Sequence, residues 1–185
     1  MCKLAGAYPV IAVDLVDSRL KFAQNLGADC VFNPKHGDVG REVQKVLSGR
    51  GADVCFECSG SAGGISLALH RGTPFPKVIC KGMYDGHAGD LYLGKEFCRS
   101  GGQILHSRAG GFRLGSEMGA ENGYYHRKWD LPRVTKTVIN LLQSGKLIID
   151  RLISHRFRLE QVKEAYALID QHPDQVTKVI FDLTL

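Results

Sequence analysis

No stretch of the sequence is apolar for long enough to cross a bilayer, which takes about twenty consecutive apolar residues. No signal peptide, internal repeat or low-complexity tract is visible in the 185 residues. These absences argue against a membrane protein, a repeat array and a disordered chain. The hydrophobic content of 44% is typical of a globular protein, and the length suits one domain or parts of two.

The six cysteines form neither a disulfide framework nor a zinc site. Cys55 and Cys58 spell C-x-x-C, but this spacing on a strand points them to opposite faces, and no second pair follows at zinc spacing. Most of the other cysteines lie in apolar strand-like runs, where a reduced cysteine behaves as a small hydrophobe. We therefore expect no metal in this chain and a reducing, cytoplasmic location.

Basic residues gather in one segment of a chain whose net charge is only +5. Residues 95–136 hold eight Lys or Arg against four Asp or Glu, so most of the excess comes from this segment. Such a segment is a solvated face, a phosphate-facing loop or a nucleic-acid surface. Because no nucleic-acid-binding motif accompanies it, we expect no nucleic-acid partner.

The stretch 10–29, VIAVDLVDSRLKFAQNLGAD, couples a short apolar run to an acid and then to a helical pattern. Residues 10–13 are too few for a helix and predict a buried strand that ends at Asp14. Asp17 or Ser18 is placed to cap the following helix, which ends at Gly27. An acid in this position binds the ribose of a nucleotide or simply caps a turn.

Strand-like and helix-like segments alternate along the rest of the chain. Helices are predicted from Asp38, with Val39, Val43, Val46 and Leu47 facing inward, at 63–69, from Asp130, and at 159–169 with an apolar stripe of Leu159, Val162, Tyr166 and Ile169. Further strands are predicted at 30–32, 52–58, 77–81, 103–106, 151–157 and 177–182. The alternation predicts an α/β fold with a doubly wound parallel sheet, a Rossmann-like arrangement. Residues 106–129 are expected to form a long irregular loop.

Five phrases, in this order and spacing, resemble one family: VIAVDLVDSRLKFAQNLGAD, GADVCFECSG, DLYLGKEF, LLQSGKLIIDRLISHRF and LEQVKEAYALID. They are similar to the carboxyl-terminal half of the zinc-type medium-chain dehydrogenases, the group of alcohol, sorbitol and threonine dehydrogenases. The resemblance implies the cofactor-binding part of an oxidoreductase that moves a hydride between a secondary alcohol and a nicotinamide. It implies NAD as the cofactor, with NADP less favoured.

The resemblance also implies roles for individual residues. Asp14 resembles the acid that binds the adenosine ribose, and its charge would repel the 2′-phosphate of NADP. Arg19 resembles the basic residue that lies over the same ribose. The remaining implied cofactor-binding residues follow strand ends or lie near the pyrophosphate: Cys58, Ser59, Gly60, Gly82, Met83, His106, Ser107 and Lys178. No catalytic residue or metal ligand is implied for this chain.

Two parts of the family pattern are missing from the sequence. Counting back from Asp14 places the last glycine of the phosphate-binding G-x-G-x-x-G before Met1, so we expect a chain that lacks the first strand and the glycine fingerprint. That strand would lie at the centre of the sheet, where each unpaired buried backbone group costs roughly 1–3 kcal/mol. We expect either an unusual strand pairing or a partner strand to fill the gap. In the family that the sequence resembles, an amino-terminal catalytic domain supplies the zinc ligands and the proton relay, and we expect this chain to lack that domain.

The expected organisation is a truncated dinucleotide-binding domain over residues 1–111 and a loop, helix and closing segment over residues 112–185. The chain alone is predicted to be inactive, with zinc held only by the catalytic domain. Two alternatives stay open. One is a non-catalytic nucleotide-binding module. The other is a Rossmann-like methyltransferase, in which Asp14 would bind the ribose of S-adenosylmethionine.

The strand at 103–106 is expected to form a dimer interface. The resemblance implies that this last strand of the nucleotide sheet pairs with its copy in a second subunit. Neither Ile104 nor Leu105 is a charged residue or a proline, the residue types that usually protect an edge strand from pairing. We therefore expect a homodimer with a two-fold axis through this edge.

Overall fold

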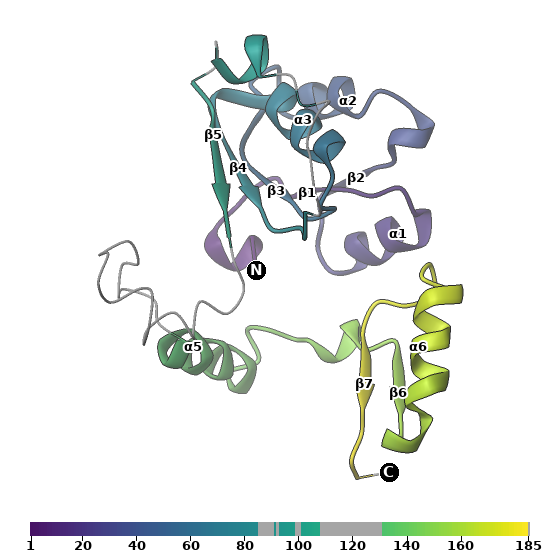
Figure 1. Ribbon diagram of the computed structural model, residues 1–185. Helices are drawn as coiled ribbons and strands as arrows, with labels where there is room; N and C mark the ends of the chain where they lie inside the picture. The colour runs from purple at the N-terminus through teal and green to yellow at the C-terminus, as the bar shows by residue number, and fades with distance from the viewer. Residues whose placement is uncertain (85–90, 92, 99–100, 108–130, 185) are drawn as a thin grey trace, which may run out of the picture. The chain divides into compact units, whose positions relative to one another are not determined.

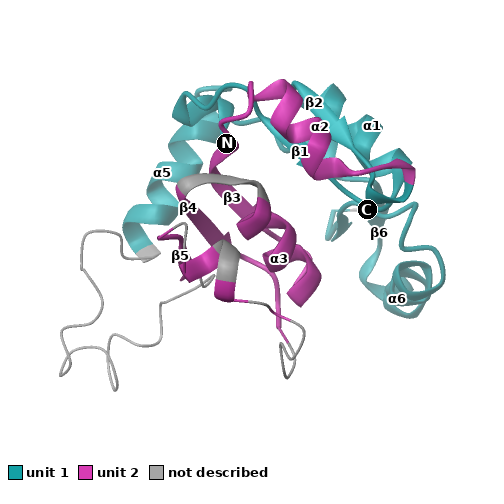
Figure 2. Cartoon of the chain, turned by 90° about the horizontal axis from the view of Figure 1, so that it is seen from above, with its two compact units in different colours: residues 1–35, 126–185 teal, residues 36–125 magenta. Residues whose placement is uncertain are grey.

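The computed structural model describes residues 1–84, 91, 93–98, 101–107 and 131–184. The chain divides into two compact units, residues 1–35 with 126–185 and residues 36–125 (Figure 2). The expected domain boundary after residue 111, the expected cap at Asp130 and most of the loop at 106–129 lie outside the described residues.

The first unit begins with a parallel strand pair (Figure 1). β1 (Ile11–Val13) pairs with β2 (Cys30–Phe32), with Ile11 opposite Cys30. α1 (Asp17–Asn25) connects the two strands and buries Leu20. The strand, helix and strand predicted here are confirmed. The predicted cap is wrong, because Val16 is the N-cap residue and no side chain caps the helix.

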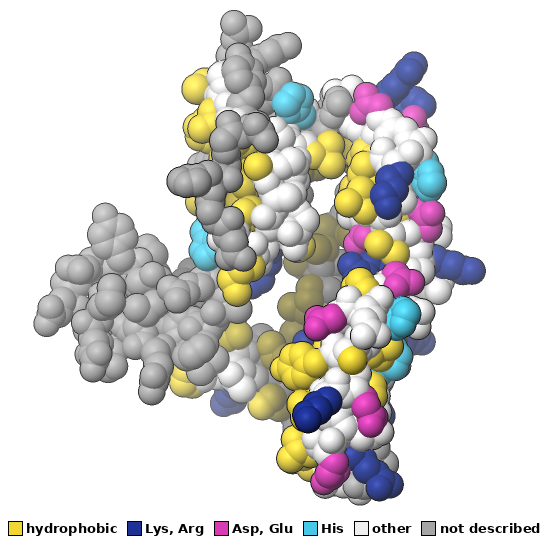
Figure 3. Space-filling model, turned by 45° about the vertical axis from the view of Figure 1, so that its right-hand side comes forward, with side chains coloured by type: hydrophobic (Ala, Val, Ile, Leu, Met, Phe, Trp, Pro, Cys, Tyr) yellow, Lys and Arg dark blue, Asp and Glu magenta, His cyan; other side chains and the backbone are white. Residues whose placement is uncertain are grey.

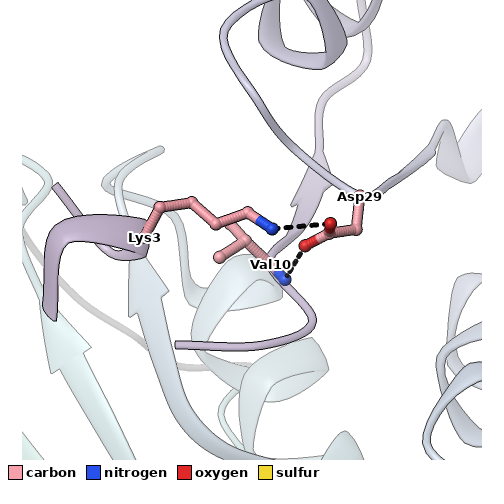
Figure 4. A network of polar contacts seen from close by, with 3 residues as sticks. All are labelled: Lys3, Val10 and Asp29. Carbon is pink, nitrogen blue, oxygen red and sulfur yellow. Dashed lines mark hydrogen bonds and ion pairs between the residues drawn. The ribbon is translucent and has the colours of Figure 1, made fainter. Parts of the chain in front are cut away.

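Asp29 ties the amino-terminal turn η1 (Lys3–Ala5) to this strand pair (Figure 4). Lys3 Nζ lies 2.6 Å from Asp29 Oδ1, and the Val10 amide donates to Asp29 Oδ2 at 2.6 Å. Both donors stabilise the charged carboxylate, Lys3 more than Val10, and they hold the pKa of Asp29 below its ordinary value. The Asp29 amide also donates to the Val10 carbonyl at 2.8 Å, so one residue sets the start of both strands.

The carboxyl-terminal part of the first unit holds α5 (Leu131–Gln143), η4 (Asp150–Leu152), β6 (His155–Phe157), η5 (Leu159–Gln161), α6 (Val162–Gln171) and β7 (Val179–Phe181). β6 and β7 pair in parallel. β6 is shorter than the predicted strand at 151–157, because η4 takes up its first residues.

α6 buries Ala165. Two residues of the predicted apolar stripe are instead exposed, Tyr166 of α6 by 61% and Leu159 of the preceding η5 by 57%. Figure 3 shows hydrophobic side chains at the surface, among charged groups, on the face it draws.

The second unit is a three-stranded parallel sheet with helices. Its elements are α2 (Val39–Val46), β3 (Ala52–Glu57), α3 (Ala62–Arg71), β4 (Gly72–Cys80), η3 (Gly94–Cys98) and β5 (Gln103–His106), after the short turn η2 (Pro34–His36). The strand order is β3-β4-β5. Asp38 caps α2 as predicted, with its side chain accepting from the Arg41 amide at 3.1 Å. Val46, predicted to face inward, is 36% exposed.

The core of this unit lies between α3 and the sheet. Ile65 and Leu69 of α3 are buried against Val78 and Cys80 of β4. Cys55 also packs against this cluster, whereas Cys58 is exposed, so the C-x-x-C pair divides between core and surface. No disulfide joins the six cysteines, all of which lie in the described part of the chain.

The described strands form three separate parallel sheets, β1-β2, β3-β4-β5 and β6-β7. Among the described residues, β1 pairs only with β2, and β3 pairs only with β4. A strand supplied by a partner stays a prediction. The architecture confirms an α/β chain with parallel strands.

Candidate functional site

The tip of β3 is built around a buried carboxylate. Glu57 is the last residue of the strand and only 4% exposed. Its Oε1 accepts from the Ser59 amide at 2.7 Å and from the Ser59 hydroxyl, and its Oε2 accepts from the Gly60 amide at 3.1 Å. The turn that follows the strand is therefore folded around this side chain.

Tyr84 joins the tip of β4 to the same carboxylate. Its hydroxyl donates to Glu57 Oε2. Burial alone raises the pKa of Glu57, but the hydrogen bonds from Ser59, Tyr84 and Gly60 outweigh burial and bring the pKa below its ordinary value. Burial and the hydrogen bond to Glu57 raise the pKa of Tyr84 well above its ordinary value. Both shifts favour an ionised carboxylate beside a neutral phenol.

Two glycines allow the tips of β3 and β4 to touch. Gly60 has a φ of +73°, and a Cβ there would overlap the carbonyl oxygen of Met83. A Cβ at Gly82 would overlap the amide nitrogen of Gly60. Glycine is therefore required at both positions by backbone contact.

The tip of β5 completes this edge of the sheet. Glu57, Cys80 and His106 are aligned across the three strands. The Ser107 amide donates to the Cys80 carbonyl at 2.9 Å, and Lys81 Nζ donates to the Ser107 carbonyl at 3.5 Å. The second unit thus gathers most of the sequence-predicted site residues at one carboxyl edge: Cys58, Ser59, Gly60, Gly82, Met83, His106 and Ser107. Met83 is 87% exposed at this edge.

Asp14 follows β1 in the first unit and is half-buried. Its amide donates to the Phe32 carbonyl at 3.3 Å, and its Oδ1 accepts from the Val16 amide at 2.9 Å. The turn-capping geometry considered from the sequence is therefore present. The hydrogen bond from Val16 occupies one carboxylate oxygen of Asp14 and orients the carboxylate at the end of β1.

Asn33 holds the loop between Asp14 and α1. It is 8% exposed, and its Nδ2 donates to Asp17 Oδ1 at 2.6 Å and to the Leu15 carbonyl at 3.3 Å. Its Oδ1 accepts from the Lys35 amide at 2.9 Å.

Arg19 and Lys178 both lie in the first unit and have exposed side chains. Arg19 Nη2 donates to the Pro173 carbonyl at 2.5 Å, a contact that the sequence does not suggest. Lys178 precedes β7, and its backbone is hydrogen-bonded to Ser154. Roles for these residues in cofactor binding remain predictions.

Sequence reasoning does not identify Glu57, Tyr84 and Asn33 as site residues. The Glu-x-x-Gly phrase that contains Glu57 is visible in the sequence, whereas Asn33-Pro34 indicates only a turn. Among the described residues, no group of three His, Cys, Asp or Glu side chains is placed to hold a metal. No helix in the described ranges is both long and apolar enough to span a membrane.

Comparison with known proteins places this chain among dehydrogenases. It is 31% identical over 184 residues to an L-threonine 3-dehydrogenase of Pyrococcus abyssi, covering 99% of this chain and 47% of that protein. It is 33% identical over 181 residues to a D-guloside 3-dehydrogenase of Escherichia coli, covering 97% and 49%. The chain spans about half the length of the curated relatives it matches.

Solved structures share the fold. An alcohol dehydrogenase from E. coli in complex with NADH matches with a TM-score of 0.76 at 18% identity, covering 98% of this chain and 47% of that one. A zinc-binding dehydrogenase from Sinorhizobium meliloti bound to NADP matches with a TM-score of 0.69 at 22% identity, covering 88% and 42%. These matches bear out a Rossmann-like region. Residues 1–120 also match the family model described as zinc-binding dehydrogenase, and the chain belongs to that family.

Proposed function

We propose that this chain is the cofactor-binding part of an NAD(P)-dependent, alcohol dehydrogenase-like oxidoreductase. The whole protein would transfer a hydride between a secondary alcohol and the nicotinamide. The observation that carries this proposal is the shared carboxyl edge of β3, β4 and β5, where the three strand tips lie side by side (Figure 1). Ligands of open α/β sheets bind outside the carboxyl ends of the strands.

Asp14 is proposed to bind the adenosine ribose. The Val16 amide holds Oδ1, which leaves Oδ2 to accept a ribose hydroxyl. A carboxylate at this position disfavours a 2′-phosphate, because two negative groups would be held close together. The fold accommodates NADH in one solved structure and NADP in another. The choice between the two cofactors therefore depends on the charge near the adenosine ribose. We therefore propose NAD as the preferred cofactor of this chain.

The β3 and β4 tips are proposed to bind a part of the dinucleotide that carries no negative charge. The amides of Ser59 and Gly60 are engaged by Glu57, so they do not form an anion-binding nest. An ionised carboxylate beneath them further disfavours a phosphate. The tip fits the nicotinamide and its ribose, which carry hydroxyl and amide groups. When bound, the nicotinamide supplies the hydride chemistry.

Glu57 and Tyr84 are positioning residues in this proposal. They lie beneath the strand tips and fix the backbone that meets the cofactor. In this proposal the zinc ligands and the proton relay belong to the catalytic domain of the whole protein. The cytoplasm is the proposed location, because cysteines placed in apolar strand-like runs are typical of a reducing compartment.

Isothermal titration of the purified chain with NAD, NADP, ADP-ribose and S-adenosylmethionine tests this proposal. We expect NAD to bind more tightly than NADP, and ADP-ribose to retain much of the affinity of NAD. Tighter binding of S-adenosylmethionine than of NAD would favour the methyltransferase alternative. Absence of binding by NAD, NADP and ADP-ribose would contradict the proposal.

A further inference from the structure

Glu57 carries a buried negative charge that its hydrogen-bond donors do not cancel. The side chain is 4% exposed. Among the described residues, its carboxylate accepts from the Ser59 amide and hydroxyl, the Gly60 amide and the Tyr84 hydroxyl, and all of these groups are neutral. Neutral donors stabilise an ionised carboxylate but leave its net charge in place. The turn after β3 therefore encloses a full negative charge.

This charge lies directly beneath the tips of β3 and β4. A Cβ built on Gly82 would come within 3.1 Å of Glu57 Oε2. The Glu57 carbonyl also accepts from the Lys81 amide at 2.7 Å and from the Gly82 amide at 3.1 Å, so the residue contacts the tip of β4 through its backbone as well. Neither Gly60 nor Gly82 has a side chain that would keep a ligand away from the carboxylate.

The other charged or titratable groups near this edge lie farther from the carboxylate or are exposed to water. Cys80 is aligned with Glu57, so the next residue, Lys81, projects from the opposite face of the sheet, where its Nζ donates to the Ser107 carbonyl at 3.5 Å. His106 is two strands away from Glu57, a separation of about 10 Å. Water and salt screen an exposed charge more strongly than a buried one. Glu57 therefore sets the sign of the charge beneath the β3 and β4 tips.

The sign of this charge distinguishes the parts of a nicotinamide dinucleotide. The pyrophosphate is negative, and the adenine and the two riboses are neutral. The oxidised nicotinamide ring carries one positive charge, which it loses on reduction. A fixed carboxylate attracts a cationic ring more strongly than a neutral ring of the same shape.

We propose that Glu57 makes this edge of the sheet discriminate between the two redox states of the cofactor, in favour of the oxidised form. The inference rests on the proposed function, and it adds an electrostatic role to the positioning role of Glu57. The charge of the residue, and not only its hydrogen bonds, then sets the relative affinity for NAD and NADH. By thermodynamic linkage, tighter binding of the oxidised form makes the bound cofactor harder to reduce.

The ratio of the dissociation constants for NAD and NADH, measured by titration of the 185-residue chain, tests the inference. Both ligands have the same adenosine and pyrophosphate, so a general weakening of the site cancels in the ratio. Glu57→Gln removes the charge and keeps the shape of the side chain. We expect it to shift the ratio on the order of tenfold in favour of NADH, as for one charge at roughly 10 Å under partial screening.

Two matched controls separate charge from structure. Tyr84→Phe removes a hydrogen bond to Glu57 and keeps the charge, so any loss of affinity should be equal for NAD and NADH. Asp53→Asn removes an exposed charge near the other end of β3, which water screens, and should leave the ratio at the wild-type value.

An unchanged ratio in folded Glu57→Gln would overturn the inference, because a purely structural role weakens both ligands alike. A shift of the same size in Tyr84→Phe or Asp53→Asn would also overturn it. If circular dichroism shows that Glu57→Gln is unfolded, Glu57→Gln combined with Tyr84→Phe replaces it, since this pair leaves fewer donors without an acceptor, and the same shift is expected. A wild-type chain that bound neither NAD, NADH nor ADP-ribose would instead contradict the proposed function itself.

Discussion

Gly82 lies directly against the backbone of Gly60, and a Cβ built on Gly82 would come within 2.5 Å of the Gly60 Cα. This contact joins the tip of β4 to the tip of β3 without any side chain between them. Glu57 lies beneath the contact and accepts hydrogen bonds from the Gly60 amide and from Tyr84. The carboxyl edge of the sheet is thus a tightly fitted backbone surface.

Gly82→Ala should destabilise the chain. The new methyl group would meet backbone atoms, which cannot move aside as a flexible side chain would, and overpacking of this kind costs about 1–3 kcal/mol. Urea unfolding measures the effect. Gly63→Ala is the control, because its Cβ meets no atom within 4 Å and alanine favours a helix such as α3. Equal stability of the two variants would show that the tips do not touch as described.

Glu57→Gln should also lower stability. The amide of glutamine keeps one acceptor oxygen, so the donors from Ser59, Gly60 and Tyr84 can no longer all be satisfied, at a cost of about 1–3 kcal/mol. The exposed residue Glu160, changed to Gln, is the matched control and should have no measurable effect. If both variants unfold at the wild-type urea concentration, Glu57 does not organise the strand tips.

The Lys3–Asp29 network predicts a specific acid sensitivity. Because the folded pKa of Asp29 is lower than its ordinary value of 3.8, its contribution to stability is present above that value. The contribution is lost as the pH falls through the lower, folded pKa. Asp29→Asn should therefore have a lower free energy of unfolding than the wild type at neutral pH. At strongly acidic pH the two free energies of unfolding should become equal. Urea unfolding across the pH range, with Asp170→Asn as a control, should show this convergence only at Asp29.

The edge of β5 is proposed to form a homodimer. The Ser107 amide donates to Cys80 of β4, so along an alternating strand the Leu105 amide faces β4 as well, and the His106 amide faces the open edge. His106→Pro removes an edge donor and should give monomers, whereas His106→Ala keeps the amide and should stay dimeric. Light scattering distinguishes these states. A dimer in both variants would place the interface elsewhere. A monomeric wild type would show that this edge forms no dimer.

The sequence is sufficient to predict most of the elements and the edge at which the site residues gather. Hydrophobic runs bounded by turn residues locate β1, β2, β3 and β5, and parallel pairing places the carboxyl ends of the strands of each sheet at one edge of that sheet. β4 begins earlier than predicted, at Gly72, because it also pairs with Ala52 across an irregular register that no local pattern encodes. Pro76 is fully buried within this extension.

The hydrogen-bond partners of the site could not be predicted. Tyr84 reaches Glu57 across 27 positions, and this pairing depends on the register of β3 and β4. The predicted cap of α1 is wrong because Asp17 is already the first residue of the helix, and its carboxylate accepts from Asn33, which follows β2. The contact between Arg19 and Pro173 likewise requires the fold, since helix patterns indicate only that Arg19 is exposed.

Amide NMR spectroscopy maps the cofactor site on the labelled chain. If this chain binds a nicotinamide dinucleotide as proposed, added NADH shifts the amide signals of Asp14 and of the strand tips at Ser59, Gly60, Gly82, Met83 and Ser107. Signals from the middle of α6, such as that of Ala165, should stay in place. Saturable shifts confined to other parts of the chain, or no shifts at millimolar NADH, would contradict the assignment of this chain as a nicotinamide dinucleotide-binding unit.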